Sequence, residues 1–327
     1  MTASTEKKIA YLFPGQGSQA VGMGRELHQH FPIARAVFEE ADEALGFSLS
    51  RLCFEGPEEE LKRTENTQPA ILTVSVAVLR VLAERGIDCH MAAGHSLGEY
   101  SAHVAAGSFP FVEAVRTVRN RGRYMQEAVP PGEGAMAAIL GLTAEQVAEV
   151  CASAAHESGG VVAPANINSP EQTVISGAAA AVEMAAAMCK ERGAKRTVML
   201  QVSAPFHCAL MQSAQDRLAE DLCQLKFETP GVPVVSNVDA GWVATGEAAR
   251  EALIRQVTGA VRWVECERQL IAAGATHFIE VGPGNVLCGL MRQLDRAQTC
   301  LRVENLVSLE KALATLAGEA DVQPPRG

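Results

Sequence analysis

The central stretch of this sequence is Met91-Ala92-Ala93-Gly94-His95-Ser96-Leu97-Gly98-Glu99-Tyr100, which contains the pattern Gly94-x-Ser96-x-Gly98. This pattern is typical of a nucleophile elbow, in which a serine occupies a sharp turn between a strand and a helix and exposes its hydroxyl group. Residues 87–93 are mostly small or apolar, as expected for a buried strand, and residues 97–107 have helical character and end at a glycine. The sequence therefore predicts the strand, the turn and the helix that the pattern requires, with Ser96 as the candidate nucleophile.

Length and composition limit the classes of protein to consider. The chain has 327 residues, of which 48% are hydrophobic, which is enough for a sizeable core in one large domain or two. A formal net charge of −10 disfavours non-specific binding to nucleic acid. We see no apolar run that approaches the roughly 18 residues of a membrane span, and no secretory signal in the polar residues 1–8. We therefore expect a globular, cytoplasmic protein that binds neither nucleic acid nor a membrane.

The cysteines and histidines form no recognisable metal-binding pattern. Nine cysteines are scattered along the chain without a C-x-x-C motif, and the eight histidines include no H-E-x-x-H motif. Disulfide bonds are rare in cytoplasmic proteins. We therefore expect reduced thiols and a site that needs no metal ion.

The order of predicted elements indicates two domains. Residues 135–200 contain four predicted strands and two helices in the order β-α-β-β-α-β, which is the ferredoxin-like unit, and a hinge rich in proline and glycine precedes them. We therefore predict a small ferredoxin-like domain at residues 131–202, inserted into a large α/β domain formed by residues 1–130 and 203–327. Within the large domain, we expect the strand-and-glycine units at 9–17 and 276–284 to flank the elbow strand.

Ser96 needs a general base, because a serine hydroxyl is a poor nucleophile until its proton is removed. His207 is the best candidate, since it follows the last strand of the small domain in a loop that contains proline, where the two domains should meet. His95 is adjacent to Ser96, and neighbouring side chains diverge on a turn. We find no Asp or Glu in a comparable loop between Ser96 and His207, so the group that orients the imidazole remains open: a carbonyl, an amide or an unidentified carboxylate.

The glycine-rich turn after the first predicted strand, residues 14–19, allows two interpretations. The backbone N–H of Gln16 can serve as an oxyanion-hole donor beside the N–H of Leu97, the residue that follows the nucleophile. Alternatively, Gly15-x-Gly17-x-x-Ala20 fits a loose dinucleotide-binding fingerprint. That fingerprint needs an acid at the end of the second strand, whereas the acids at this distance lie in a helix-like segment; they are Glu39, Glu40 and Asp42.

Several motifs together resemble one family, the malonyl-CoA:acyl carrier protein transacylases, over about residues 8–290. The motifs are Pro14-Gly15-Gln16-Gly17-Ser18-Gln19, Gly94-His95-Ser96-Leu97-Gly98-Glu99-Tyr100, Arg121-Gly122, Asn166-x-Asn168-Ser169-Pro170, Pro205-Phe206-His207 and Glu280-Val281-Gly282-Pro283-Gly284. The resemblance implies a hydrolase-like core with a parallel sheet and a ferredoxin-like insert. It also implies an acyltransferase of fatty-acid biosynthesis that uses malonyl-CoA and acyl carrier protein and binds no cofactor.

The resemblance also implies a role for each matching residue. Ser96 would carry the malonyl group as an ester, and His207 would act first as base and then as acid. Gln16 and Leu97 would form the oxyanion hole, and Arg121 would bind the malonyl carboxylate. The main-chain carbonyl of Gln256 would orient the histidine, and the supporting residues would be Gln68 and His95.

Elementary chemistry favours the same use of Arg121, because the planar guanidinium fork matches a carboxylate with two parallel hydrogen bonds. Two alternatives remain at this stage. One is a serine esterase or thioesterase on the same fold, with water as the acceptor. The other is a dinucleotide-binding module built on the glycine-rich turn.

Overall fold

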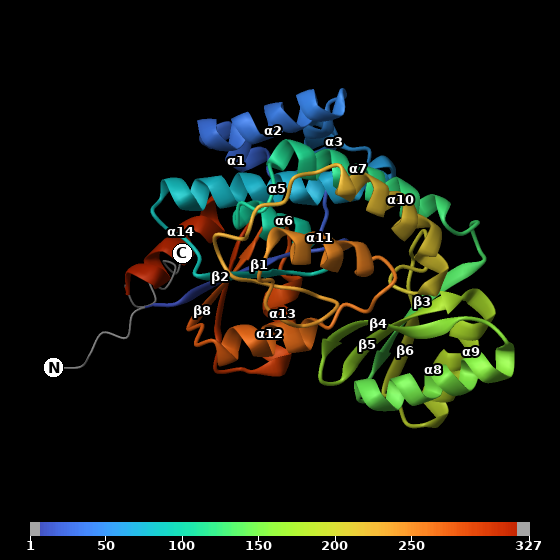
Figure 1. The fold of residues 1–327 in the computed structure, drawn as a ribbon. Helices are drawn as coiled ribbons and strands as arrows, with labels where there is room; N and C mark the ends of the chain where they lie inside the picture. The colour runs from blue at the N-terminus through green and yellow to red at the C-terminus, as the bar shows by residue number, and fades with distance from the viewer. Residues whose placement is uncertain (1–6, 319–327) are drawn as a thin grey trace.

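Two β-sheets of different character organise residues 7–318, the part of the chain that this computed structural model describes (Figure 1). The larger sheet has five strands in the order β7-β2-β1-β8-β9, and all of its pairings are parallel. Its strands are β1 (Ile9–Phe13), β2 (Met91–Gly94), β7 (Val234–Val235), β8 (His277–Val281) and β9 (Thr299–Val303). The glycine-rich turn after β1 and the elbow after β2 therefore lie at the same edge of the sheet, since neighbouring parallel strands end together.

The smaller sheet is antiparallel and has the order β4-β5-β3-β6. In chain order its elements are β3 (Gly134–Leu140), α8 (Ala144–Ser158), β4 (Val162–Ser169), β5 (Gln172–Ala178), α9 (Ala179–Glu191) and β6 (Arg196–Met199). This connectivity is the β-α-β-β-α-β unit expected from the sequence, so an α/β fold with a parallel core and a separate ferredoxin-like unit is confirmed. The domain boundaries themselves, at residues 131 and 202, stay a prediction.

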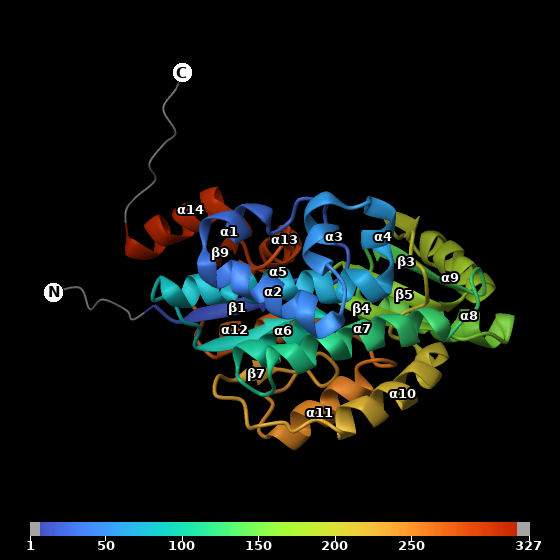
Figure 2. The same ribbon diagram turned by 90° about the horizontal axis from the view of Figure 1, so that it is seen from above.

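Helices cover both faces of the parallel sheet (Figures 1 and 2). Alternate residues of β1 enter two separate apolar clusters: Tyr11 and Phe13 belong to one, Ala10 and Leu12 to the other. This period of two is what a strand buried on both faces requires. The helices that follow the parallel strands or lead into them are α1 (Arg25–His30), α2 (Pro32–Leu45), α3 (Leu49–Glu55), α4 (Glu58–Lys62), α5 (Thr64–Glu84), α6 (Gly98–Ala105), α7 (Phe111–Glu127), α10 (Gln212–Cys223), α11 (Gly246–Arg255), α12 (Trp263–Ala272), α13 (Val286–Leu294) and α14 (Leu306–Ala317).

The strand order corrects one expectation. The unit at 276–284 does not flank the elbow strand, because β1 lies between β2 and β8. The neighbours of β2 are β1 and the two-residue strand β7. The residues that follow β7 therefore lie beside the elbow, which the sequence did not indicate.

Helix α5 differs from one expectation of the sequence. It begins at Thr64, contains Pro69 in its first turns and is 21 residues long. By length and composition it is apolar enough to cross a membrane, whereas the sequence showed no such run. Most of α5 is buried inside the protein, as in the core helix of a globular protein.

A cysteine pair also departs from the expectation of reduced thiols. Cys288 on α13 and Cys300 on β9 form a disulfide bond, with their Cα atoms 5.4 Å apart, while the other seven cysteines are free. The packing of α13 against β9 brings the two residues within bonding distance, although they are twelve positions apart in the sequence. The expectation was therefore wrong for this pair.

Direct backbone hydrogen bonds join strand β4 of the small sheet to the loop before α12. The N–H of Val261, just before α12, donates to the carbonyl of Ala165 at 2.8 Å, and the N–H of Ile167 donates to the carbonyl of Val261 at 2.8 Å. These bonds hold β4 against the edge of the large domain where the elbow lies. They place Asn166 and Asn168 on one wall of the cavity above Ser96.

Candidate active site

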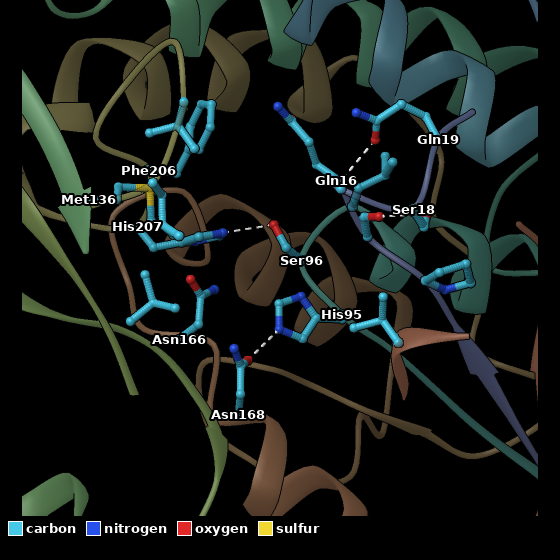
Figure 3. A pocket seen from close by; sticks show the side chains of 18 of the residues that line it. Gln16, Ser18, Gln19, His95, Ser96, Met136, Asn166, Asn168, Phe206 and His207 are labelled. Carbon is cyan, nitrogen blue, oxygen red and sulfur yellow. Dashed lines mark hydrogen bonds between the residues drawn. The ribbon is translucent and has the colours of Figure 1, made fainter. Parts of the chain in front are cut away.

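Ser96 occupies a strained position on the turn between β2 and α6. Its φ angle is +52°, a left-handed conformation that is uncommon for a residue with a side chain. Gly94 and Gly98 make the turn possible, because a Cβ on Gly94 would lie 1.9 Å from the carbonyl carbon of Gly98, and one on Gly98 would lie 2.0 Å from the oxygen of Phe13. The turn is therefore pressed against the end of β1, and the serine hydroxyl is directed into the cavity (Figure 3).

His207 lies against Ser96, although 111 residues separate them in the sequence. Its Nε2 is 2.7 Å from Ser96 Oγ, and its Nδ1 is 2.8 Å from the main-chain oxygen of Gln256 (Figure 3 shows the first contact). A carbonyl oxygen only accepts, so Nδ1 must carry the hydrogen and Nε2 must accept from the serine hydroxyl. This is the tautomer that a general base needs.

The electrostatic surroundings keep His207 neutral. Burial, followed by the positive charge of Arg121, lowers its pKa to about 3. The imidazole is therefore free to accept the Ser96 proton at any pH near neutrality. In the part of the chain that the structure describes, no carboxylate orients the ring; the carbonyl of Gln256 occupies that position.

Arg121 projects from α7 into the floor of the cavity and is 1% exposed. Its Nη2 donates to Ser96 Oγ at 3.1 Å and to Gln256 Oε1 at 3.0 Å, and its Nη1 donates to Gln68 Oε1 at 2.8 Å. All these acceptors are neutral, and no ion pair with Arg121 occurs within residues 7–318. A buried guanidinium without a counter-ion, beside the nucleophile, is a ready binding site for an anionic acyl group.

The two proposed oxyanion-hole donors line the same cavity. Leu97 follows the nucleophile, and Gln16 is brought near because Gly15 packs against His95; a Cβ on Gly15 would lie 2.5 Å from the His95 oxygen. Among the described residues, neither the Leu97 N–H nor the Gln16 N–H donates to another protein group. Two free donors beside the serine are the arrangement that stabilises an oxyanion.

The supporting residues occupy two different places. Gln68 on α5 and Gln256 at the end of α11 both accept hydrogen bonds from the Arg121 guanidinium through their side-chain oxygens. His95 points to the other side, where its Nε2 is 2.8 Å from Asn168 Oδ1 (Figure 3). Its ring also packs near Trp263. His95 therefore ties the elbow to the small sheet and does not contact the serine hydroxyl.

Two residues that we did not single out complete the site. Asn237 follows β7, and its Oδ1 accepts from the N–H of Ser96 at 2.7 Å while its Nδ2 donates to the Gly94 oxygen at 2.8 Å. Glu99 is fully buried and accepts hydrogen bonds from Asn237 and Gln256. The position of Glu99 within the elbow motif was the available signal for that residue. Asn237 had none, because the pairing of β7 with β2 could not be read from the sequence.

The cavity has a volume of about 520 Å³. It is lined by the turns that follow β1 and β2 of the parallel sheet and by residues of β3, β4 and β5 in the small sheet. Within residues 7–318, no cluster of three His, Cys, Asp or Glu side chains could hold a metal ion. The dinucleotide interpretation finds no support, because Glu39, Glu40 and Asp42 lie on α2 and not at the end of a strand. What the site offers is nucleophilic chemistry on an acyl group that carries a negative charge.

Comparisons with known proteins agree with this geometry. Residues 10–315 match the family model described as acyl transferase domain. The chain is similar to the malonyl CoA-acyl carrier protein transacylases of Bacillus subtilis (50% identity, covering 96% of this chain and 99% of the relative) and of Escherichia coli K12 (51%, covering 88% and 93%).

Solved structures show the same similarity. An acyl carrier protein S-malonyltransferase from Vibrio cholerae superimposes with a TM-score of 0.91 at 47% identity, covering 94% of this chain and all of that one. A malonyl-transacylase solved in complex with a type II polyketide-synthase acyl carrier protein superimposes with a TM-score of 0.92 at 46% identity, covering 94% and 100%.

Proposed function

The chain belongs to the acyl transferase family, and we propose that it is a malonyl-CoA:acyl carrier protein transacylase of fatty-acid biosynthesis. It moves malonyl from coenzyme A to the phosphopantetheine thiol of an acyl carrier protein. The observation that carries the choice of substrate is the buried Arg121 guanidinium 3.1 Å from Ser96 Oγ. The esterase and dinucleotide-binding alternatives are not supported.

In the first half-reaction, we propose that Ser96 Oγ attacks the thioester carbonyl of malonyl-CoA. The serine proton moves to His207 Nε2 along the 2.7 Å contact as the oxygen–carbon bond forms. The negative charge on the former carbonyl oxygen is held by the N–H groups of Leu97 and Gln16. The carbon–sulfur bond then breaks, and the proton on His207 passes to the departing thiolate, which leaves as free coenzyme A.

In the second half-reaction, the carrier-protein thiol takes the place of coenzyme A. Its proton moves to His207, its sulfur attacks the malonyl–Ser96 ester, and the same two N–H groups hold the new oxyanion. When the ester bond breaks, the proton returns from His207 to Ser96 Oγ. Each half-reaction thus uses the histidine once as base and once as acid, with the carbonyl of Gln256 fixing the ring throughout.

Arg121 gives the site its preference for malonyl. The free carboxylate of the acyl group pairs with the guanidinium, whose present partners are neutral oxygens that a carboxylate can replace. An acyl group without a carboxylate leaves the buried cation unpaired. The same pairing fixes the thioester carbonyl relative to Ser96 and the oxyanion donors.

The enzyme works without a bound cofactor or metal ion, since the residues above supply the base, the oxyanion donors and the cation. It acts in the cytoplasm. The small ferredoxin-like domain spans residues 131–202 and supplies one wall of the cavity through Asn166 and Asn168.

The test is the mass of the intact protein after mixing with malonyl-CoA and no acceptor. We expect one malonyl adduct, located by peptide mapping at Ser96, which disappears when acyl carrier protein bearing a free thiol is added. The Ser96→Ala variant should form no adduct. An adduct on another residue would contradict the assignment of the nucleophile, and steady release of free malonate without any thiol acceptor would favour a thioesterase.

A further inference from the structure

A buried row of polar side chains leads from Arg121 away from the cavity to Glu99. Glu99 is the second residue of α6, and its side chain is fully buried. Its Oε2 accepts from Gln256 Nε2 at 2.5 Å and from the Asn237 N–H at 3.1 Å. The other polar atom of the Gln256 amide, Oε1, accepts from Arg121 Nη2 at 3.0 Å. The amide of Gln256 therefore bridges a guanidinium and a carboxyl group.

The orientation of this bridge follows from the chemistry of its neighbours. A guanidinium only donates, and the main-chain oxygen of Ser96, 3.0 Å from Gln256 Nε2, only accepts. The amide oxygen must therefore face Arg121, and the amide N–H groups must face Ser96 and Glu99. The positive end of the amide dipole points at Glu99, which favours an ionised carboxylate there.

In the free enzyme, Glu99 is the acid nearest to Arg121 along this chain of hydrogen bonds. An ionised Glu99 offsets part of the free-energy cost of the buried guanidinium. When the malonyl carboxylate pairs with Arg121, the site holds two anions and one cation. A buried net charge is costly, so the second anion disfavours the ionised form of Glu99.

The Glu99 side chain has a place for the proton that would restore neutrality. Oε2 accepts both hydrogen bonds, whereas Oε1 has no hydrogen-bond partner among the described residues. A proton on Oε1 leaves the bonds from Gln256 and Asn237 intact. The bridge can therefore keep its geometry in both charge states.

We propose that binding of malonyl-CoA is coupled to the uptake of a proton by Glu99, which acts as a positioning residue through Gln256. The inference rests on the proposed pairing of the malonyl carboxylate with Arg121. The main-chain carbonyl of Gln256 also holds His207. A change in the charge of Glu99 therefore affects both Arg121 and His207 through the same residue.

The titration range of Glu99 fits this role. Burial raises its pKa to about 7, although the hydrogen bonds from Asn237 and Gln256 and the charge of Arg121 oppose the effect of burial. Its proton affinity therefore lies where a nearby charge can change its ionisation. The other titratable or charged groups that face Glu99 or its bridge are Tyr100 on α6, Arg121 on α7, the surface ion pair Asp239–Arg255, Cys266 on α12 and His207.

Among these groups, His207 is the competitor that the experiment must separate from Glu99. Arg121 lowers the pKa of His207, and a carboxylate bound to Arg121 weakens that effect. Burial raises the pKa of Cys266 and of Tyr100, so both stay protonated and add no proton on binding.

The experiment is isothermal titration calorimetry of the full-length Ser96→Ala protein, which cannot form the ester. Malonyl-CoA is titrated at about pH 8 in buffers of different ionisation enthalpy, which gives the number of protons taken up. We expect uptake approaching one proton per malonyl-CoA. We expect none with acetyl-CoA, which carries the same coenzyme A but no acyl carboxylate.

Two double variants assign the proton. Ser96→Ala with Glu99→Gln should bind malonyl-CoA without proton uptake, and Ser96→Ala with Glu99→Asp should retain the uptake. Unchanged uptake in the Glu99→Gln protein would place the proton on His207 and overturn the inference. Equal uptake with acetyl-CoA would overturn it too.

A second measurement does not depend on the folding of these variants. In the Ser96→Ala protein, the affinity for malonyl-CoA should fall by up to about tenfold per pH unit above pH 7, while the affinity for acetyl-CoA follows a flatter course. Tight binding of malonyl-CoA with no proton uptake would overturn only the role of Glu99. Failure of malonyl-CoA to bind at all would contradict the proposed function as well.

Discussion

At the scale of single residues, the charge of Arg121 decides which acyl group the site accepts. Arg121→Ala removes the cation while keeping the nucleophile and base, so kcat/KM for malonyl-CoA should fall by roughly 100-fold or more, as when one partner of a buried charge pair is lost. The selectivity for malonyl-CoA over acetyl-CoA should fall with it. Steady-state rates with both thioesters measure the two quantities.

The matched control for this variant is Arg123→Ala on the same helix. Arg123 is exposed, donates a hydrogen bond to Asn120 and lies over the ring of Tyr124, away from Ser96, so its loss should leave the selectivity unchanged. If Arg121→Ala lowered the rates with both thioesters equally, Arg121 would be a structural residue and not the carboxylate site.

The sequence predicted the residues that carry recognisable motifs, and missed those defined only by distant contacts. Ser96, His207 and Arg121 lie in stretches whose composition suggests their chemistry, and the structure brings them together in one cavity. Asn237, which was missed, bonds to Ser96 across 141 positions. Gln256 was expected only from the family resemblance, as the carbonyl that orients His207, and its side-chain bond to Glu99 across 157 positions was not expected. No local pattern reports a hydrogen bond over such a separation, because it depends on which strands become neighbours.

At the scale of elements, the contact between the end of β1 and the start of α6 holds the elbow. Gly98→Ala would place a methyl group 2.0 Å from the backbone oxygen of Phe13, which cannot move without shifting β1. We expect a loss of about 1–3 kcal/mol in the free energy of unfolding, measured by urea denaturation. Because the shift displaces Ser96 from His207, formation of the malonyl ester should slow in the same protein.

Gly289→Ala on α13 is the control for this substitution. Apart from the backbone of its own helix, no atom in residues 7–318 lies within 4 Å of the position of its Cβ, so the exchange should be neutral or should stabilise the helix by about 0.5–1 kcal/mol. Equal losses in the two variants would mean that the close approach at Gly98 does not matter for folding.

Elements with a clear hydrophobic period were predicted well, and the last strand was not. The buried strand β1 and the four strands of the small sheet follow from their composition and turns. The sequence did not reveal β9 (Thr299–Val303), in which only Val303 is buried and no alternation of buried and exposed residues is seen. It also did not reveal that β9 pairs with β8, so the contact between Cys288 and Cys300 could not be foreseen.

At the scale of the whole molecule, the buried titratable groups make the stability depend on pH in two opposite directions. Burial lowers the pKa of His207 to about 3 and that of His103 to about 4, below the ordinary value of 6.5. Between these values the unfolded chain binds protons that the folded protein does not. These two groups therefore reduce the stability as the pH falls below 6.5, and they have no effect above it.

Glu267 on α12 has the opposite effect. Its side chain is fully buried and its two oxygens have no hydrogen-bond partner within residues 7–318. Burial, together with the charge of Glu280, raises its pKa from 4.5 to about 9. Between these values the folded protein holds a proton that the unfolded chain has lost, so the free energy of unfolding should fall by up to about 1.4 kcal/mol per pH unit.

Glu267→Gln isolates this contribution, because glutamine is neutral in both states. Urea denaturation at a series of pH values from 7 to about 9 should show a steep loss of stability in the wild-type protein and a much shallower one in the variant. The slope, and not the absolute stability, is the readout, since a buried amide without partners can itself destabilise the fold. Glu310→Gln, which removes an exposed carboxylate on α14, should keep the wild-type slope. A Glu267→Gln slope equal to that of the wild type would show that this carboxyl group is ionised in the folded protein.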